Sequence, residues 1–255
     1  MPQSPPGPQA TDVALAAIVS VSPLGTIDDV IAIMKQLDRG LPDDDGLKWF
    51  NLLYLRVTEE VQKQEADGGW QNPAWLSRLD VVFAKLYFDA VTAYTRDRDS
   101  VARAWRPLFD ARYREGIARV QFALAGMNAH INHDLPMALV QTSQELGLAL
   151  HDDGPEHSDY EKVNSILEMV EQRVKPLFDV GIIGEIDRKL GSVDDVIAMW
   201  KVRKARETAW ENAEILQHLA GLPALTESFL LSLDRLVSLA SQGLLVPIVT
   251  RAETA

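Results

Sequence analysis

The chain has 255 residues, a length that suits one large domain or two small ones. It carries 25 Lys and Arg against 37 Asp and Glu, and the resulting formal charge of −12 argues against binding to nucleic acid or to anionic membranes. Cysteine is absent, which excludes disulfides, thiolate catalysis and zinc sites made of cysteine.

Neither end of the sequence suggests a targeting or membrane segment. No apolar run approaches the ~18 residues of a spanning helix. Residues 1–11 are rich in proline and lack the basic residues that open a signal peptide, so they are interpreted as a disordered tail. We therefore expect a cytoplasmic protein with a helical domain over residues 12–245 and a C-terminal tail over residues 246–255.

Most of the chain repeats hydrophobic residues every three or four positions, which is typical of amphipathic helices. Thr26 with Asp29 forms a capping signature before one helix, and Asn72 followed by Pro73 opens another. The acidic run 43–45 between helices favours a loop or cap over a metal site. Long strand-like alternation is absent, so the sequence predicts an all-α, single-domain multi-helix bundle.

The most unusual stretch is QFALAGMNAHINHDLPMALVQT, residues 121–142, which is apolar on both flanks and polar in the middle. Burying its polar groups is costly unless each finds a partner. These groups are Asn128, His130, Asn132, His133 and Asp134. We therefore expect the chemistry of the protein to lie here.

His130 precedes His133 by three residues and Asp134 by four, so a helix would place the three side chains on one face. Two interpretations follow. The three could bind a divalent metal such as zinc, although the H-E-x-x-H signature is absent. Alternatively, Asp134 could orient one imidazole as a general base, since a carboxylate fixes the tautomer.

A purely structural interpretation rests on Pro136, which is disfavoured inside a helix, and on Leu135 before it. It predicts that one helix ends near His133 and that another begins at Pro136. Asp134 would then cap the second helix, and His133 would lie near the C-terminal end of the first.

Polar residues also fall on apolar-leaning faces elsewhere. Asp80 could reach the interior or could be exposed and ion-paired, and Asn164 could hold either structure or a ligand. A later predicted helix could fix an anionic or aromatic ligand by stacking guanidinium on indole, or could simply present a basic face. Its Trp and Arg residues are Trp200, Arg203, Arg206 and Trp210.

The segment AGMNAHINHDLPMA, residues 125–138, resembles the signature of a bacterial and fungal family of helical proteins of unknown function, and the resemblance covers most of residues 46–220. In that family's pattern the first His and the Asp recur, whereas the position of His133 varies. The resemblance therefore implies His130 with Asp134 as the pair, and it supplies no reaction. The His-Asp pair before Leu135 also resembles the metal-binding dyad of HD-type phosphohydrolases, but that family has an upstream His and none precedes His130 here.

The favoured hypothesis is an enzyme that acts on a small, largely apolar molecule in a helical pocket. His130 would be the acid or base and Asp134 would orient it, in cofactor-independent proton transfer such as cyclisation, isomerisation or elimination, for example in specialised metabolism. The predicted substrate-binding residues are Asn128, Asp80, Tyr87, Asp159, Asn164, Arg206 and Trp210, with Trp49 beside Tyr87 on the wall.

Two alternatives stay open. The first is a metal-dependent hydrolase, in which His130, His133 and Asp134 are the ligands and a bound water is the nucleophile. Asp80, Asp159 or His157 would assist them. The second is a non-catalytic binding or scaffold protein whose polar groups form a satisfied core network. The sequence leaves the oligomeric state open.

Overall fold

The computed structural model describes residues 10–20, 24–178 and 202–247, and this part of the chain folds as one all-α domain without strands. The predicted fold class is thereby confirmed. The elements are α1 (Ala10–Val19), α2 (Ile27–Gly40), α3 (Gly46–Asp67), α4 (Pro73–Arg96), the short 3₁₀ turn η1 (Arg98–Ser100), α5 (Arg106–Ala111), α6 (Arg119–Ala129), the π-helical turn η2 (His130–Asp134), α7 (Leu135–Glu145), α8 (Pro155–Phe178), α11 (Val202–His218) and α12 (Pro223–Leu244).

The first long helices begin where the sequence predicts. Thr26 and Asp29 form a reciprocal capping box at the start of α2. The Asp45 side chain accepts the backbone N–H of Leu47 at the start of α3, and Asn72 caps α4 in front of its first-turn proline.

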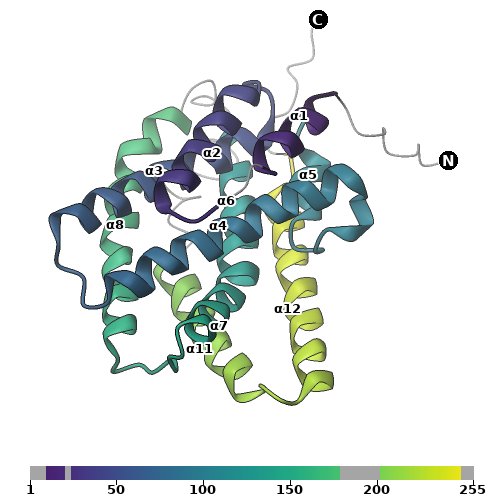
Figure 1. Cartoon of the computed structure of the whole chain (residues 1–255). Coiled ribbons are helices and arrows are strands. Elements are labelled where there is room, and N and C mark those ends of the chain that lie inside the picture. Colours follow the sequence, from purple (N-terminus) through teal and green to yellow (C-terminus); the bar gives the residue numbers. More distant parts are fainter. Residues whose placement is uncertain (1–9, 21–23, 179–201, 248–255) are drawn as a thin grey trace, which may run out of the picture.

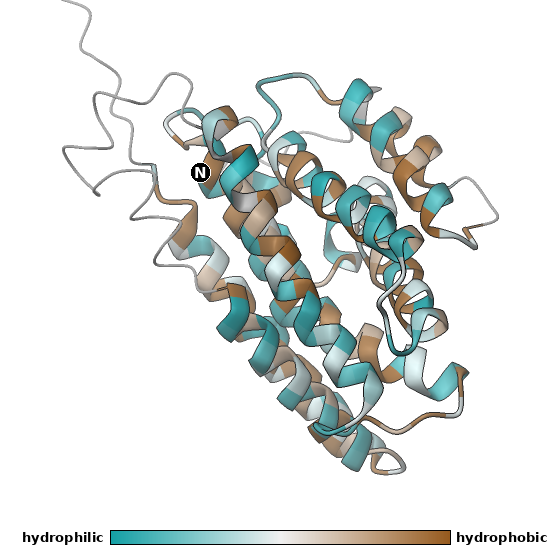
Figure 2. Ribbon diagram, turned by 90° about the vertical axis from the view of Figure 1, so that its left-hand side faces the viewer, coloured by the Kyte–Doolittle hydropathy of each residue, from teal (hydrophilic) through white to brown (hydrophobic). Residues whose placement is uncertain are grey.

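The continuous rod of α6, η2 and α7 runs through the middle of the bundle, with α8 and α12 on opposite sides (Figure 1). Helices α3 and α12 pack mainly on α6, and α4 and α11 pack on α7. Hydrophilic and hydrophobic residues alternate around the helices (Figure 2), as expected of elements that bury one face. Gly126 lets α3 approach α6 closely, because a Cβ there would lie 2.4 Å from the Phe50 ring.

A buried ion cluster joins α1, the start of α3 and the end of α5. Arg112 is 3% exposed and donates to Asp45 at 2.8 Å and to Asp12 at 2.7 Å. Its carbonyl accepts the N–H of Gly46 at 2.8 Å. Asp45 therefore belongs to a structural cap and ion pair, in agreement with the loop-or-cap interpretation of the acidic run.

Both α5 and α8 contain proline. Pro107 lies in the first turn of α5, which follows Trp105 and packs on α12. Pro176 lies inside α8, two residues before its end, where it removes one backbone hydrogen bond without ending the helix. No helix in the described ranges is long and apolar enough to cross a membrane. Trp200 and most of the two predicted tails lie outside those ranges.

Candidate functional site

The segment 130–134 forms a π-helical turn that joins α6 to α7 without a break. The N–H of Leu135 donates to the carbonyl of His130, five residues earlier. The prediction that a helix ends near His133 was therefore wrong. The wider turn absorbs one extra residue just before Pro136, which has no N–H to donate. Asp134 makes no capping hydrogen bond to the backbone.

The carboxylate of Asp134 gathers three side-chain donors. Its Oδ2 lies 2.9 Å from His130 Nδ1 and accepts Trp105 Nε1–H at 3.0 Å. Its Oδ1 lies 2.7 Å from His133 Nδ1. Because a carboxylate can only accept, both histidines must carry their proton on Nδ1. Trp105, which precedes α5, is a member of this site that the sequence reasoning did not find.

The pKa values of the two histidines and of Asp134 are shifted in different directions. Burial lowers the pKa of His130, although Asp134 acts the other way. For His133, burial is outweighed by the hydrogen bond to Asp134 and by the charges of Asp134 and Asp234, so its pKa is raised. Burial of Asp134 is likewise outweighed by its two histidine partners, and its pKa is lowered. At neutral pH the cluster therefore holds a neutral His130 and an ionised Asp134, and the positive form of His133 is favoured more than in a free imidazole.

The ring of His130 is 1% exposed and enclosed by aromatic side chains. Phe83 stacks on it with ring centroids 3.5 Å apart, and Tyr54 meets it edge-on at 4.7 Å. Phe50, Tyr87 and Trp105 complete the enclosure. His130 Nε2 has no hydrogen-bond partner among the described residues. A buried polar atom without a partner is uncommon and is expected where water, ligand or chemistry is to be accommodated.

Beyond this aromatic enclosure, Asp80 on α4 is neither exposed nor ion-paired with another described residue, so of the two alternatives that the sequence left open it reaches the interior. Its Oδ2 is buried without a partner in the described part of the chain. Burial raises its pKa to about 7, with a further contribution from Glu65, whereas Arg206 acts to lower it. The pKa of Tyr54 is raised by burial and then by the charges of Asp80 and Asp134, so the two carboxylates act on the same phenol.

Arg206 and Asn164, both predicted to bind substrate, contact each other. Arg206 is 5% exposed, donates from Nε to Asn164 Oδ1 at 2.8 Å, and donates to the carbonyl of Tyr160 at 2.7 Å. Its guanidinium lies 3.9 Å from the centroid of the Tyr160 ring, rather than on Trp210. Asn164 Nδ2 has no partner within the described ranges. Arg203 is exposed and pairs with Glu168.

The remaining predicted residues have structural contacts. Asn128 donates to the carbonyl of Val237 and to Ser241, which ties α6 to α12. Asp159 accepts the N–H groups of Gln71 and Asn72 and so fixes the start of α4.

The predicted aromatic residues likewise lie in packed positions. Tyr87 is fully buried, and its hydroxyl is 3.5 Å from Asn51. Trp210 packs against Tyr160, and Trp49 lies under the guanidinium of Arg119.

His133, unlike His130, lines a pocket of about 890 Å³ between α7, α11 and α12. Met137 and Leu230 contribute to its wall. Asp234 of α12 lies 3.5 Å from His133 Nε2 and accepts the N–H of Ala104 at 2.8 Å. Asp234 was not predicted, and no sequence signal would have found it, because it lies 100 residues beyond Asp134 and is brought near only by the packing of α12.

The residues proposed as metal ligands do not point at a common centre. Both imidazoles direct Nδ1 at Asp134, so the three groups bond to one another. In the ranges that the structure describes, no group of three or more His, Asp or Glu side chains is arranged to hold a metal ion.

Fold and site together define an all-α protein with a buried histidine–carboxylate cluster. The model of the family of unknown function DUF5995 matches residues 27–247, so the chain belongs to this family. This confirms the resemblance to a helical family of unknown function. No curated protein and no solved structure matches the chain at a significant level.

Proposed function

We propose that the protein is an enzyme that moves a proton on a small, largely apolar molecule without a cofactor, with His130 Nε2 as the reactive atom. The observation that carries the proposal is the asymmetry of this imidazole. Its Nδ1 is bonded to Asp134, whereas its Nε2 is buried and has no partner in the part of the chain that the structure describes. A histidine that serves only structure is expected to use both nitrogens.

The surroundings suit a general base. With Nδ1 protonated, Nε2 holds a free lone pair, and the lowered pKa keeps the ring neutral at physiological pH. Asp134 would orient the ring and stabilise the imidazolium that forms. Asp80, with a pKa of about 7, can give or take a proton near neutrality. Asn164 Nδ2, which has no partner among the described residues, could donate to a polar atom of the substrate.

Entry to the ring requires a motion, because His130 is enclosed. The other four rings around it are buried, whereas Phe83 is half-buried. We place the entrance at Phe83, whose rotation would uncover the imidazole, as mobile side chains and loops do in many enzymes. A cyclisation, isomerisation or elimination in the cytoplasm fits this arrangement.

The test compares wild type with His130→Gln, whose amide can still bond Asp134. Each protein is incubated with a fractionated extract of small molecules, and products are followed by chromatography with mass detection, so that isomers of equal mass are separated. His151→Gln, which changes an exposed loop histidine, is the matched control. We expect a compound that wild type and the control convert and that His130→Gln leaves unchanged.

The 1% exposure of His130 and the structural contacts of Asn128 and Asp159 favour the non-catalytic alternative. It predicts that His130→Gln lowers the thermal midpoint while all three proteins leave every fraction unchanged. That outcome would reject the enzyme proposal.

A further inference from the structure

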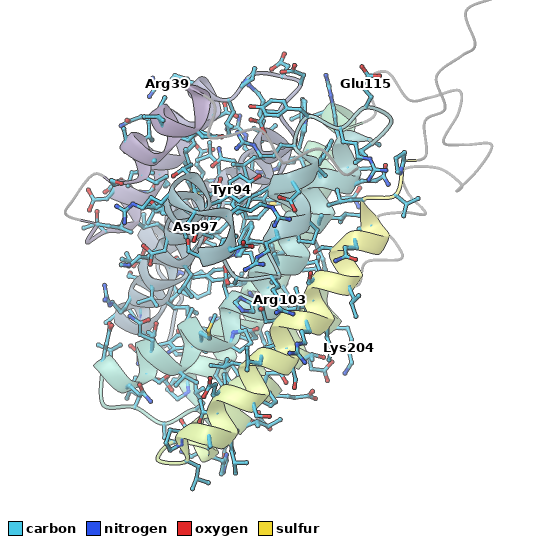
Figure 3. The ribbon with its side chains drawn as sticks, turned by 90° about the vertical axis from the view of Figure 1, so that its right-hand side faces the viewer. Arg39, Tyr94, Asp97, Arg103, Glu115 and Lys204 are labelled. Carbon is cyan, nitrogen blue, oxygen red and sulfur yellow. The ribbon has the colours of Figure 1, made fainter. Side chains whose placement is uncertain are left out.

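A second pocket, of about 740 Å³, lies between α5 and the C-terminal half of α12, away from the His130 cluster. Five arginines line it: Arg98, Arg103, Arg106, Arg114 and Arg235. One of them, Arg103, lies beside α12 (Figure 3). Asp110 is its one acidic lining residue. We call this pocket the arginine groove.

Two of these arginines already have acidic partners. Arg98 donates to both carboxylate oxygens of Asp110, through Nε at 2.7 Å, and Arg106 lies 3.2 Å from Asp99. The guanidinium groups of the other three form no ion pair or hydrogen bond with any described residue, and all three residues are exposed: Arg103, Arg114 and Arg235.

The local charge is opposite to that of the protein. Five arginines against Asp110 and Asp99 leave a local charge of 5 − 2 = +3, in a chain whose formal charge is −12. Gathering unpaired guanidiniums in one groove is unfavourable unless an anion joins them, because like charges repel and a concave low-dielectric wall concentrates their field. The net negative charge of the chain can be explained by solubility, but solubility does not explain a local positive charge in this groove.

The lining also indicates the chemistry of the anion. The three unpaired guanidiniums come from three separate segments, so they can approach one group from different sides. A phosphate presents oxygens in several directions, whereas a carboxylate presents two in one plane. The apolar side chains of Pro107, Ala111, Leu239 and Leu245 complete the lining and favour an organic group next to the charge.

We propose that the arginine groove is a binding site for a small organic phosphate, with a diphosphate held by Arg103, Arg114 and Arg235 and an apolar part against Leu239. The groove is separate from the His133 pocket, since the two have no lining residue in common. The inference is therefore independent of the proposed acid–base function.

The probe is inorganic pyrophosphate, titrated by calorimetry into the full chain at fixed ionic strength and without divalent cations. The test variant is Arg103→Gln/Arg114→Gln/Arg235→Gln. The control is Arg39→Gln/Arg56→Gln/Lys63→Gln, which removes three exposed positive charges from α2 and α3 and reaches the same net charge. We expect the test variant to bind at least about tenfold more weakly than wild type, the control to bind within about twofold, and geranyl diphosphate to bind more tightly than pyrophosphate.

Each other outcome overturns the proposal. Equal weakening in both variants would mean that only long-range charge is sensed. No heat with wild type at millimolar pyrophosphate would mean that no such site exists. A concentration-dependent dimer that the test variant alone loses would mean that the groove contacts a second copy of the chain.

Discussion

Asp134 offers the sharpest test of the central cluster, because Asp134→Asn keeps the size of the side chain and removes its charge. The carboxylate accepts from Trp105, His130 and His133 at 2.7–3.0 Å and is 3% exposed. An amide has one oxygen for these three donors and turns its own NH₂ toward at least one of them. His133 would also lose its nearest counter-charge, so its positive form would be buried without compensation.

The magnitude follows from these two losses. A buried donor left without a partner costs about 1–3 kcal/mol, and removing one member of a buried ion pair costs about 3–5 kcal/mol in all. We therefore expect Asp134→Asn to lower the free energy of unfolding by about 3–5 kcal/mol. Urea unfolding followed by tryptophan fluorescence should show a midpoint lower by more than about 1 M.

The penalty should also depend on pH. The raised pKa of His133 adds stability that is complete below its unfolded value of about 6.5 and is lost as pH rises through the folded value. The lowered pKa of Asp134 adds stability that is present above its unfolded value of about 4 and is lost as pH falls. The difference between wild type and Asp134→Asn should therefore be largest near about pH 5–6 and smaller at pH 9.

The control is Asp89→Asn, which breaks an exposed i,i+4 pair with Lys85 on α4 and should cost less than about 1 kcal/mol. If Asp134→Asn proves as mild as Asp89→Asn, or if its penalty does not change with pH, the charged hydrogen-bonded cluster described above is wrong.

Three further predictions concern other parts of the molecule. Asp80→Asn should stabilise the protein at pH 8 by up to about 4 kcal/mol and change its stability little at pH 4. The folded pKa of Asp80 is raised to about 7, so this carboxyl destabilises the wild-type fold increasingly as pH rises above its unfolded pKa. Thermal melts at the two pH values measure the difference, and equal shifts would contradict it. Gly126→Ala should cost about 1–3 kcal/mol by overpacking, whereas Gly243→Ala, which meets open space in α12, should be neutral or stabilising in the same denaturation assay. Arg112→Met should lower the free energy of unfolding by about 3–5 kcal/mol in urea, since it leaves the buried carboxylate of Asp45 without its ion-pair partner. The double variant Arg112→Met/Asp45→Asn should lose less than the sum of the two single losses, and additive losses would count against the ion pair.

Local patterns in the sequence determined the helices. The caps at Thr26, Asp45 and Asn72 depend on bonds within three residues of each cap, and the amphipathic spacing needs only one helix to be recognised. The pairing of His130 with Asp134 was also local, because four residues make one helical turn.

Only the tertiary structure decided what surrounds that pair. Trp105 and Asp234 reach the cluster from 29 and 100 residues away, and Phe83 covers the imidazole from α4. The π-helical turn ran against the local preference at Pro136, because packing of α6 and α7 as one rod outweighed it. Burial by distant helices set the pKa of Asp80 and left His130 Nε2 without a partner among residues 10–20, 24–178 and 202–247. Desolvation depends on every neighbour in space, whereas a sequence records only neighbours along the chain.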